Sequence, residues 1–295
     1  MVNNNIPRPR VACEVSMERV VAARAGDKQS ALESATAQTL PAGALVPGLQ
    51  QANLAARAEV VDALRDSLGI VAGRSRDVVL VIPDATTRIM LLDFDTLPDK
   101  LGDAEGVVRF RLKKSLPFDI DQSAVSFDRQ VAADKSLRVI AAVTPRTVIE
   151  EYESAVREAG YNPGTVIPSM IAALGAVDAT APAMIIKVES GITSFAIVDQ
   201  NHLLLYRALE NGGAVVTGES LIDDVNTSLV YFEDRYNVAI DRLLVSGVQS
   251  GQALQAAFSD RAIRVEELVP ASLAGAAASN VSRSALAGVA GALVS

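Results

Sequence analysis

Short apolar blocks separated by turn residues run along the whole chain, and most are too short for helices, so we predict strands. Residues 78–82 form a continuous apolar run ended by Pro83-Asp84, which is typical of a strand buried on both faces. Residues 11–15 and 20–24 predict an opening hairpin, whereas residues 26–53 show weak periodicity, and we expect a long loop there. Further strands are predicted at residues 87–94, 124–131, 137–143, 184–188, 192–198, 203–209, 243–245 and 264–265.

Other segments carry apolar residues at helical spacing. Residues 57–68 predict a helix that Gly69 ends, and Pro117 must end a second helix that begins at Asp103. A third helix is predicted to begin at Thr144-Pro145. Further helices are predicted at residues 218–236 and 252–258, with an Ala-rich, closely packed helix over residues 271–295. Each half of the chain therefore begins with a hairpin and adds helices later, which predicts an α/β fold with an architectural duplication.

The composition is that of a globular protein without a nucleic-acid surface. Of 295 residues, 49% are hydrophobic and 21% are charged, which is enough to bury a core. Aromatic residues make up 4% with no Trp, which disfavours stacking on nucleic-acid bases. The net charge is −8, which disfavours binding of a nucleic-acid phosphate backbone. The basic cluster Arg109, Arg111, Lys113 and Lys114 is small, and at helical spacing we interpret it as a solvated helix face.

One Cys and one His exclude much chemistry. Cys13 cannot form a disulfide within the chain, and together with His202 it cannot supply the four ligands of a structural zinc site. His202 lies in a predicted hairpin turn over residues 199–202, where a catalytic imidazole would be too exposed. We therefore expect no Ser-His-Asp arrangement and no catalytic or metal-ligating residues. The chain has no apolar run of about 20 residues and the first ten residues lack the apolar stretch of a signal peptide, so we expect a cytoplasmic protein.

The order of elements resembles the actin, Hsp70 and sugar-kinase superfamily, and four central stretches resemble the PilM family of type IV pilus assembly proteins. These stretches are residues 79–84 (VLVIPD), 92–98 (LDFDTLP), 116–121 (LPFDID) and 125–128 (VSFD). The resemblance covers nearly the whole chain from about residue 10. It implies a two-lobed actin-like (ASKHA, ribonuclease H-like) α/β fold with mixed sheets and an inserted small subdomain. We expect residues 1–84 and 164–180 in the first lobe, 85–163 in the inserted subdomain, and 181–295 in the second lobe.

The resemblance implies ATP with Mg²⁺ as the ligand, held by two strand-turn-strand loops that typically carry Asp-x-Gly. The first loop here is Glu14-Val15-Ser16, and the second is Glu189-Ser190-Gly191 followed by Thr193. The adenosine side would be Ser246-Gly247, and Gly212-Gly213 precedes a predicted helix whose N-terminus could hold an anion. All three loops depart from the family pattern, so ordinary turns in a pseudo-ATPase are the alternative.

The resemblance also implies a partner. PilM-like proteins lie at the cytoplasmic face of the inner membrane and hold the N-terminal tail of the membrane protein PilN in a groove beside the inserted subdomain. The residues that would border this groove are Arg109, Phe110, Arg111, Leu116, Pro117, Phe118 and Phe127. Aromatic side chains often anchor interfaces. The alternative is that they fill the core of the small subdomain, as we expect for Phe127, and that the arginines are solvated.

Three functional hypotheses follow. The favoured one is an adaptor that binds a PilN-like tail and couples it to the pilus motor platform. The second is an ATP-dependent conformational switch or slow ATPase. The third is a component of type II secretion related to GspL, or a sugar-kinase-like enzyme, although we identify no Asp base for a kinase.

Overall fold

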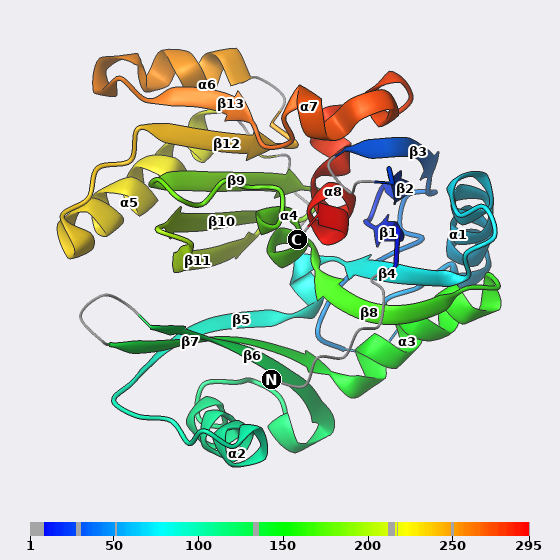
Figure 1. The fold of residues 1–295 in the computed structure, drawn as a ribbon, viewed down its shortest axis with the longest axis horizontal. Helices are drawn as coiled ribbons and strands as arrows, with labels where there is room; N and C mark the ends of the chain where they lie inside the picture. Colours follow the sequence, from blue (N-terminus) through cyan, green and yellow to red (C-terminus); the bar gives the residue numbers. More distant parts are fainter. Residues whose placement is uncertain are drawn as a thin grey trace.

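The computed structural model describes residues 9–27, 31–50, 52–131, 136–211, 216, 218–248 and 251–294. Within these ranges the chain forms two five-stranded sheets and one three-stranded sheet. The two large sheets lie on either side of a group of short helices, and the small sheet lies beside them with α2 (Figure 1). The fold is therefore mixed α/β with an added small subdomain, as the sequence predicts.

The two large sheets have the same strand order. The first sheet runs β3-β2-β1-β4-β8 and the second runs β11-β10-β9-β12-β13. In each, the first three strands are an antiparallel meander, and the remaining two continue the sheet in parallel with the first strand. The first sheet contains β1 (Val11–Val15), β2 (Arg19–Ala25), β3 (Leu32–Thr39), β4 (Asp77–Ile82) and β8 (Asn162–Pro168). The second contains β9 (Ala183–Glu189), β10 (Ile192–Asp199), β11 (His202–Glu210), β12 (Arg242–Ser246) and β13 (Arg264–Glu267).

The third sheet has the order β5-β7-β6 and is entirely antiparallel. Its strands are β5 (Arg88–Phe94), β6 (Ser123–Val131) and β7 (Leu137–Pro145), and α2 (Leu101–Leu112) covers one face. Val108 and Leu112 of α2 pack on Val139, Ala141 and Val143 of the central strand, which gives this subdomain a small core of its own.

Helices cover the outer faces of the two large sheets. The helices α1 (Arg57–Val71) and α3 (Arg146–Glu158) share one core with the first sheet, while α5 (Gly218–Tyr236) and α6 (Gly251–Ala257) share another with the second. The remaining α-helices α4 (Ser169–Leu174), α7 (Ala271–Ala274) and α8 (Ala287–Val294) lie between the two sheets. The described 3₁₀ segments are Asp84–Thr86, Ile120–Gln122, Ser259–Arg261, Gly275–Ser279 and Arg283–Leu286.

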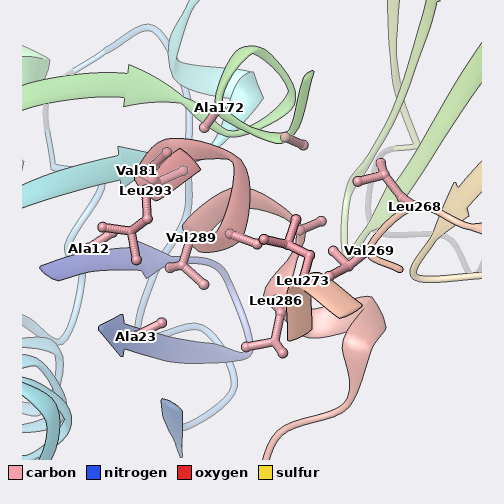
Figure 2. Packing of buried hydrophobic residues seen from close by; sticks show 14 of the residues in the cluster. Ala12, Ala23, Val81, Ala172, Leu268, Val269, Leu273, Leu286, Val289 and Leu293 are labelled. Carbon is pink, nitrogen blue, oxygen red and sulfur yellow. The ribbon is translucent and has the colours of Figure 1, made fainter. Parts of the chain in front are cut away.

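A single apolar core joins the two large sheets. Ala12 and Val81 of the first sheet belong to the same buried cluster as Ile185 and Leu244 of the second, with Val289 of α8 between them. Figure 2 shows the side chains of α8 and of the segment before it filling this space. At Gly291 an added Cβ would lie 2.0 Å from the carbonyl oxygen of Ala172, so the small residues of α8 permit its close approach to α4.

Most predicted strands and helices are confirmed, but the strands β3 and β8 and the short helix α4 were not predicted, and one predicted helix is broken. Residues 32–39 form an edge strand where a loop was expected, because Leu32 and Ala35 are its two buried residues and their spacing of three does not show the alternation of a strand. β8 was missed because Pro163 and Gly164 argue against a strand, yet an edge strand tolerates both. The expected helix over residues 271–295 is broken, since Gly275 has a φ of +52° and cannot continue it.

Helix ends and two placements also differ from expectation. α1 continues through Gly69, and α2 stops at Leu112 rather than at Pro117. α3 was expected in the inserted subdomain, but its apolar face packs on α1 and the first sheet. The reason is that the chain leaves the subdomain at the end of β7, at Pro145, before α3 begins. α8 was expected in the second lobe, but it lies in the core between the sheets and contacts β1 and β2. No helix within the described ranges is long and apolar enough to cross a membrane.

Candidate functional site

A cavity of about 620 Å³ lies between the β1–β2 hairpin of the first sheet and the β9–β10 hairpin of the second. The predicted cofactor-binding residues that line it are Glu14, Ser16, Glu189, Gly191, Ser246 and Gly247. Thr193 is buried in β10, and its hydroxyl accepts a hydrogen bond from Asn211 Nδ2 at 3.1 Å, so its side chain is engaged within the second sheet. Gly212 and Gly213 lie outside the described residues.

Strand alternation places Glu14 opposite a residue that the sequence analysis did not select, Lys187. In β1, Ala12 faces the core between the two sheets, and Glu14 follows two residues later on the same face. In β9, Ala183 and Ile185 face that core, and Lys187 follows on the same face. The two charged side chains therefore point toward each other from different sheets.

Lys187 forms ion pairs with a carboxylate on each side of the cavity. Its Nζ lies 3.1 Å from Glu14 Oε1 and donates a second hydrogen bond to Glu189. The side chains of Lys187 and Glu14 are only 5% and 6% exposed. Ser169 Oγ, at the start of α4, donates to the same oxygen of Glu14. A lysine buried to this degree needs such partners, because an unpaired ammonium would lose its hydration without compensation.

Asp84 is a further buried carboxyl group that does not line the cavity but interacts electrostatically with Lys187 and Glu14. It follows β4 and is 1% exposed. Its Oδ1 accepts a hydrogen bond from the backbone N–H of Met170 at 2.8 Å, and its Oδ2 accepts one from Ser194 Oγ at 2.7 Å. Because Met170 lies in α4 and Ser194 in β10, this carboxyl group fastens the end of the first sheet to the second.

Burial shifts the protonation of these groups. Desolvation raises the pKa of Glu189 to about 7, with Lys187 opposing the shift and Glu14 and Asp84 adding to it. Desolvation also raises the pKa of Asp84 above its ordinary value. The pKa of Lys187 is raised because the attraction of Glu14, Glu189 and Asp84 outweighs the burial that would lower it. The lysine therefore stays charged, while Glu189 titrates near neutral pH.

These residues do not fit the bound Mg²⁺ that the family resemblance implies. A carboxylate that binds Mg²⁺ must turn an oxygen toward the ion, but Oε1 of Glu14 and Oε1 of Glu189 are engaged by the Lys187 ammonium. Within the part of the chain that the structure describes, no group of three or more His, Cys, Asp and Glu side chains could hold a metal ion.

Two glycines of the cavity wall have structural reasons to be there. Gly247 has a φ of +74°, and an added Cβ would lie 1.9 Å from the carbonyl oxygen of Val188. Gly191 has a φ of +85° in the two-residue turn of the β9–β10 hairpin, where Glu189 pairs with Ile192. Both positions require glycine for the backbone alone. Ser246 beside them donates its hydroxyl to the carbonyl of Ser284 at 2.7 Å.

The predicted partner residues divide into an exposed set and a set that packs on the subdomain core. Phe110 on α2 is 74% exposed, and Arg111 and Pro117 are exposed as well. Leu116, Phe118 and Phe127 are partly buried against the core of α2 and the three-stranded sheet.

Arg109 is engaged inside the subdomain. Its Nε lies 2.8 Å from Glu105 Oε1, and its guanidinium donates to the carbonyl oxygens of Ile120 and Ser123. This arginine therefore ties α2 to the start of β6. Phe110 and Arg111 are the α2 members of the predicted set that can reach a partner without unpacking the subdomain.

Sequence reasoning missed the central residues of the site, namely Asp84, Ser169, Lys187 and Ser194. One signal was available: Lys187 interrupts the buried apolar run Met184–Val188, where an unpaired charge would be costly. Its partner Glu14 lies 173 residues away in the chain, so no spacing rule connects the two.

Neither protein-family models nor curated proteins give a match to this chain. Solved structures do. A chain of a PilM-PilN type IV pilus biogenesis complex has 15% sequence identity and a TM-score of 0.77, with 97% of each chain covered. A Bacteroides thetaiotaomicron protein described as having an actin-like ATPase fold has 10% identity and a TM-score of 0.53, covering 92% of this chain and 96% of that one. The cytoplasmic domain of EpsL from the Vibrio cholerae type II secretion system has 9% identity and a TM-score of 0.51, covering 88% and 96%. These likenesses confirm the predicted fold, and the chain is an actin-like protein in its architecture.

Proposed function

We propose that this protein is an actin-like adaptor of a type IV pilus or related secretion machine, which binds the N-terminal tail of a PilN-like inner-membrane protein from the cytoplasmic side and couples it to the motor platform. The observation that carries the proposal is the likeness to a chain of a PilM-PilN complex over 97% of both chains, which includes the inserted subdomain as well as the two lobes. Because one fold can host different functions, the proposal is tested by measuring binding directly.

The inserted subdomain offers a surface suited to this role. On α2, Phe110 and Leu101 are 74% and 68% exposed, and Val107 is 38% exposed. Val107 and Phe110 are three residues apart and so lie side by side on the helix surface, whereas Leu101 lies on the opposite side. An exposed aromatic residue with an apolar neighbour can anchor an interface. Arg111 lies next to Phe110 and could pair with a carboxylate of a bound tail.

The test is a fluorescence anisotropy titration of the purified protein with a labelled synthetic peptide of the N-terminal tail of the PilN-like protein from the same organism. We expect saturable binding and, for Phe110→Ser, an affinity at least roughly tenfold weaker, as for loss of an aromatic anchor. The free energy of unfolding should stay within about 0.5 kcal/mol of the wild type, because Phe110 is an exposed residue.

Tyr231→Ser is the matched control, since Tyr231 is 56% exposed on α5, which covers the second sheet. This variant should bind the peptide as the wild type does. Wild-type binding by Phe110→Ser would remove α2 as the proposed surface. A wild-type protein that does not bind the tail at all would contradict the adaptor role.

Two further candidates remain testable in the same assay. The likeness to the EpsL cytoplasmic domain favours a type II secretion component as the alternative machine, and a tail peptide from that system would then compete. The cavity of about 620 Å³ favours a nucleotide-dependent switch, in which ATP would change tail affinity by binding one lobe arrangement better than the other. The buried Lys187 weighs against ATP with Mg²⁺.

A further inference from the structure

We propose that Lys187 takes the place of a metal ion in the cleft, so that the protein excludes magnesium–nucleotide and holds the two sides of its cleft together with its own side chains. This inference concerns the cleft and does not depend on tail binding. It rests on the position of the lysine, on what surrounds its partner Glu14, and on the contacts that cross the cleft.

The lysine supplies positive charge where the carboxylates of the two sheets meet. Its Nζ contacts Glu14 of the first sheet and Glu189 of the second. Glu14 Oε1 and Glu189 Oε1 therefore each already have a cation within ion-pair distance. A divalent cation entering the same space would be repelled by an ammonium that is 5% exposed and thus weakly screened by water.

Other protein groups lie against Glu14, and Lys187 occupies the side through which a metal could reach it from the cavity. The Glu14 carboxylate also accepts from Ser169, and α8 closes the other side at Gly288, where an added Cβ would lie 2.5 Å from a carboxylate oxygen. Mg²⁺ gives up its water reluctantly and usually keeps several molecules in its coordination shell. With Lys187 in place the Glu14 side chain is 6% exposed, so such a shell cannot form beside it.

Further protein contacts cross the cleft beside the lysine. Asp84, after β4, accepts from Ser194 of β10, and Glu18 of the first hairpin turn accepts from Ser190 of the second. Below them the two sheets share one apolar core. The closed arrangement therefore has its own polar and apolar links, and no bridging ligand is needed to explain it.

The test compares the thermal unfolding midpoints of the wild type, Lys187→Asp and Lys187→Gln in EDTA, in Mg²⁺ and in Mg²⁺ with ATP. The wild-type midpoint should be the same in all three solutions. Lys187→Asp replaces the ammonium with a carboxylate facing Glu14, so its midpoint should be lowered in EDTA and should rise by about 5 °C in Mg²⁺ at roughly one hundred times its dissociation constant. Lys187→Gln, which removes the charge without adding a ligand, should be lowered and should not recover.

Two results would overturn the proposal. One is a wild-type midpoint that rises with Mg²⁺ and ATP, because the lysine would then be compatible with the ligand. The other is a Lys187→Asp variant that Mg²⁺ does not stabilise. Should that variant be unfolded in EDTA, recovery of its circular dichroism signal on adding Mg²⁺ supports the proposal, and a signal that stays unfolded contradicts it.

Discussion

The two large sheets share one strand order, but the hairpins that face each other across the cleft differ in charge on their first strands: β1 places Glu14 there, whereas β9 places Lys187 together with Glu189. The apolar residues of both strands alternate in the same way, with one face in the shared core and the other against the outer helices. The fold is thus maintained by the alternation, and the chemistry of the cleft changes with a single side chain on each strand.

The difference in charge between the two hairpins affects the stability of the folded protein. Two facing carboxylates would repel each other unless a bound cation lay between them. A carboxylate facing an ammonium needs no ligand, but both groups must stay buried and paired. The asymmetry therefore predicts which changes in the second hairpin are severe and which are mild.

The largest expected effect comes from breaking the charge asymmetry at Lys187. Lys187→Met leaves Glu14 and Glu189 without their cation, and loss of one partner from a buried pair costs about 3–5 kcal/mol of unfolding free energy. Urea denaturation of the wild type and of Lys187→Met measures this loss of unfolding free energy. The double variant Glu14→Gln with Lys187→Met removes the Glu14–Lys187 pair but leaves Glu189 without its cation, so it should recover part of the loss. Additive losses in the double variant would contradict a coupled pair.

The next effect concerns the residue after the fourth strand of each sheet. The first sheet has Pro83 there, with an ordinary φ of −59°, and the second has Gly247, with a φ of +74°. Gly247→Ala should cost about 2–4 kcal/mol, because an alanine is strained at positive φ and its Cβ would meet the Val188 carbonyl oxygen.

Gly43→Ala is the matched control for this change. Gly43 has a φ of +77°, but no atom lies within 4 Å of the added Cβ, so only the backbone strain of about 1–2 kcal/mol should appear. Equal losses in the two variants, measured by urea denaturation, would show that the contact with Val188 contributes nothing.

The sequence predicted the duplicated architecture because hydrophobic periodicity is local. The strand at residues 78–82 and the hairpin at the start of each half can each be predicted from a short stretch of sequence. The edge strand β8 was missed because its prolines and glycine are tolerated only by its position in the sheet. The Glu14–Lys187 pair could not be predicted, because it depends on how two distant strands face each other and not on any local spacing.

The smallest effect is a pH dependence of the unfolding free energy, to which Glu189 of the second hairpin contributes. Burial raises the pKa of Glu189 to about 7 in the folded protein, whereas an unfolded glutamate titrates near 4.5. Between these values the folded state binds more protons than the unfolded state, so the unfolding free energy should fall as the pH rises from about 4.5 to 7, by roughly 1–3 kcal/mol. Asp84, whose pKa is also raised, adds to the same slope. Glu189→Gln should make the slope shallower in urea denaturation series, while Glu59→Gln, at an exposed position of α1, should leave it unchanged. An unaltered slope in Glu189→Gln would mean that this carboxyl group is already ionised across the whole range, and that its ion pair with Lys187 offsets its burial.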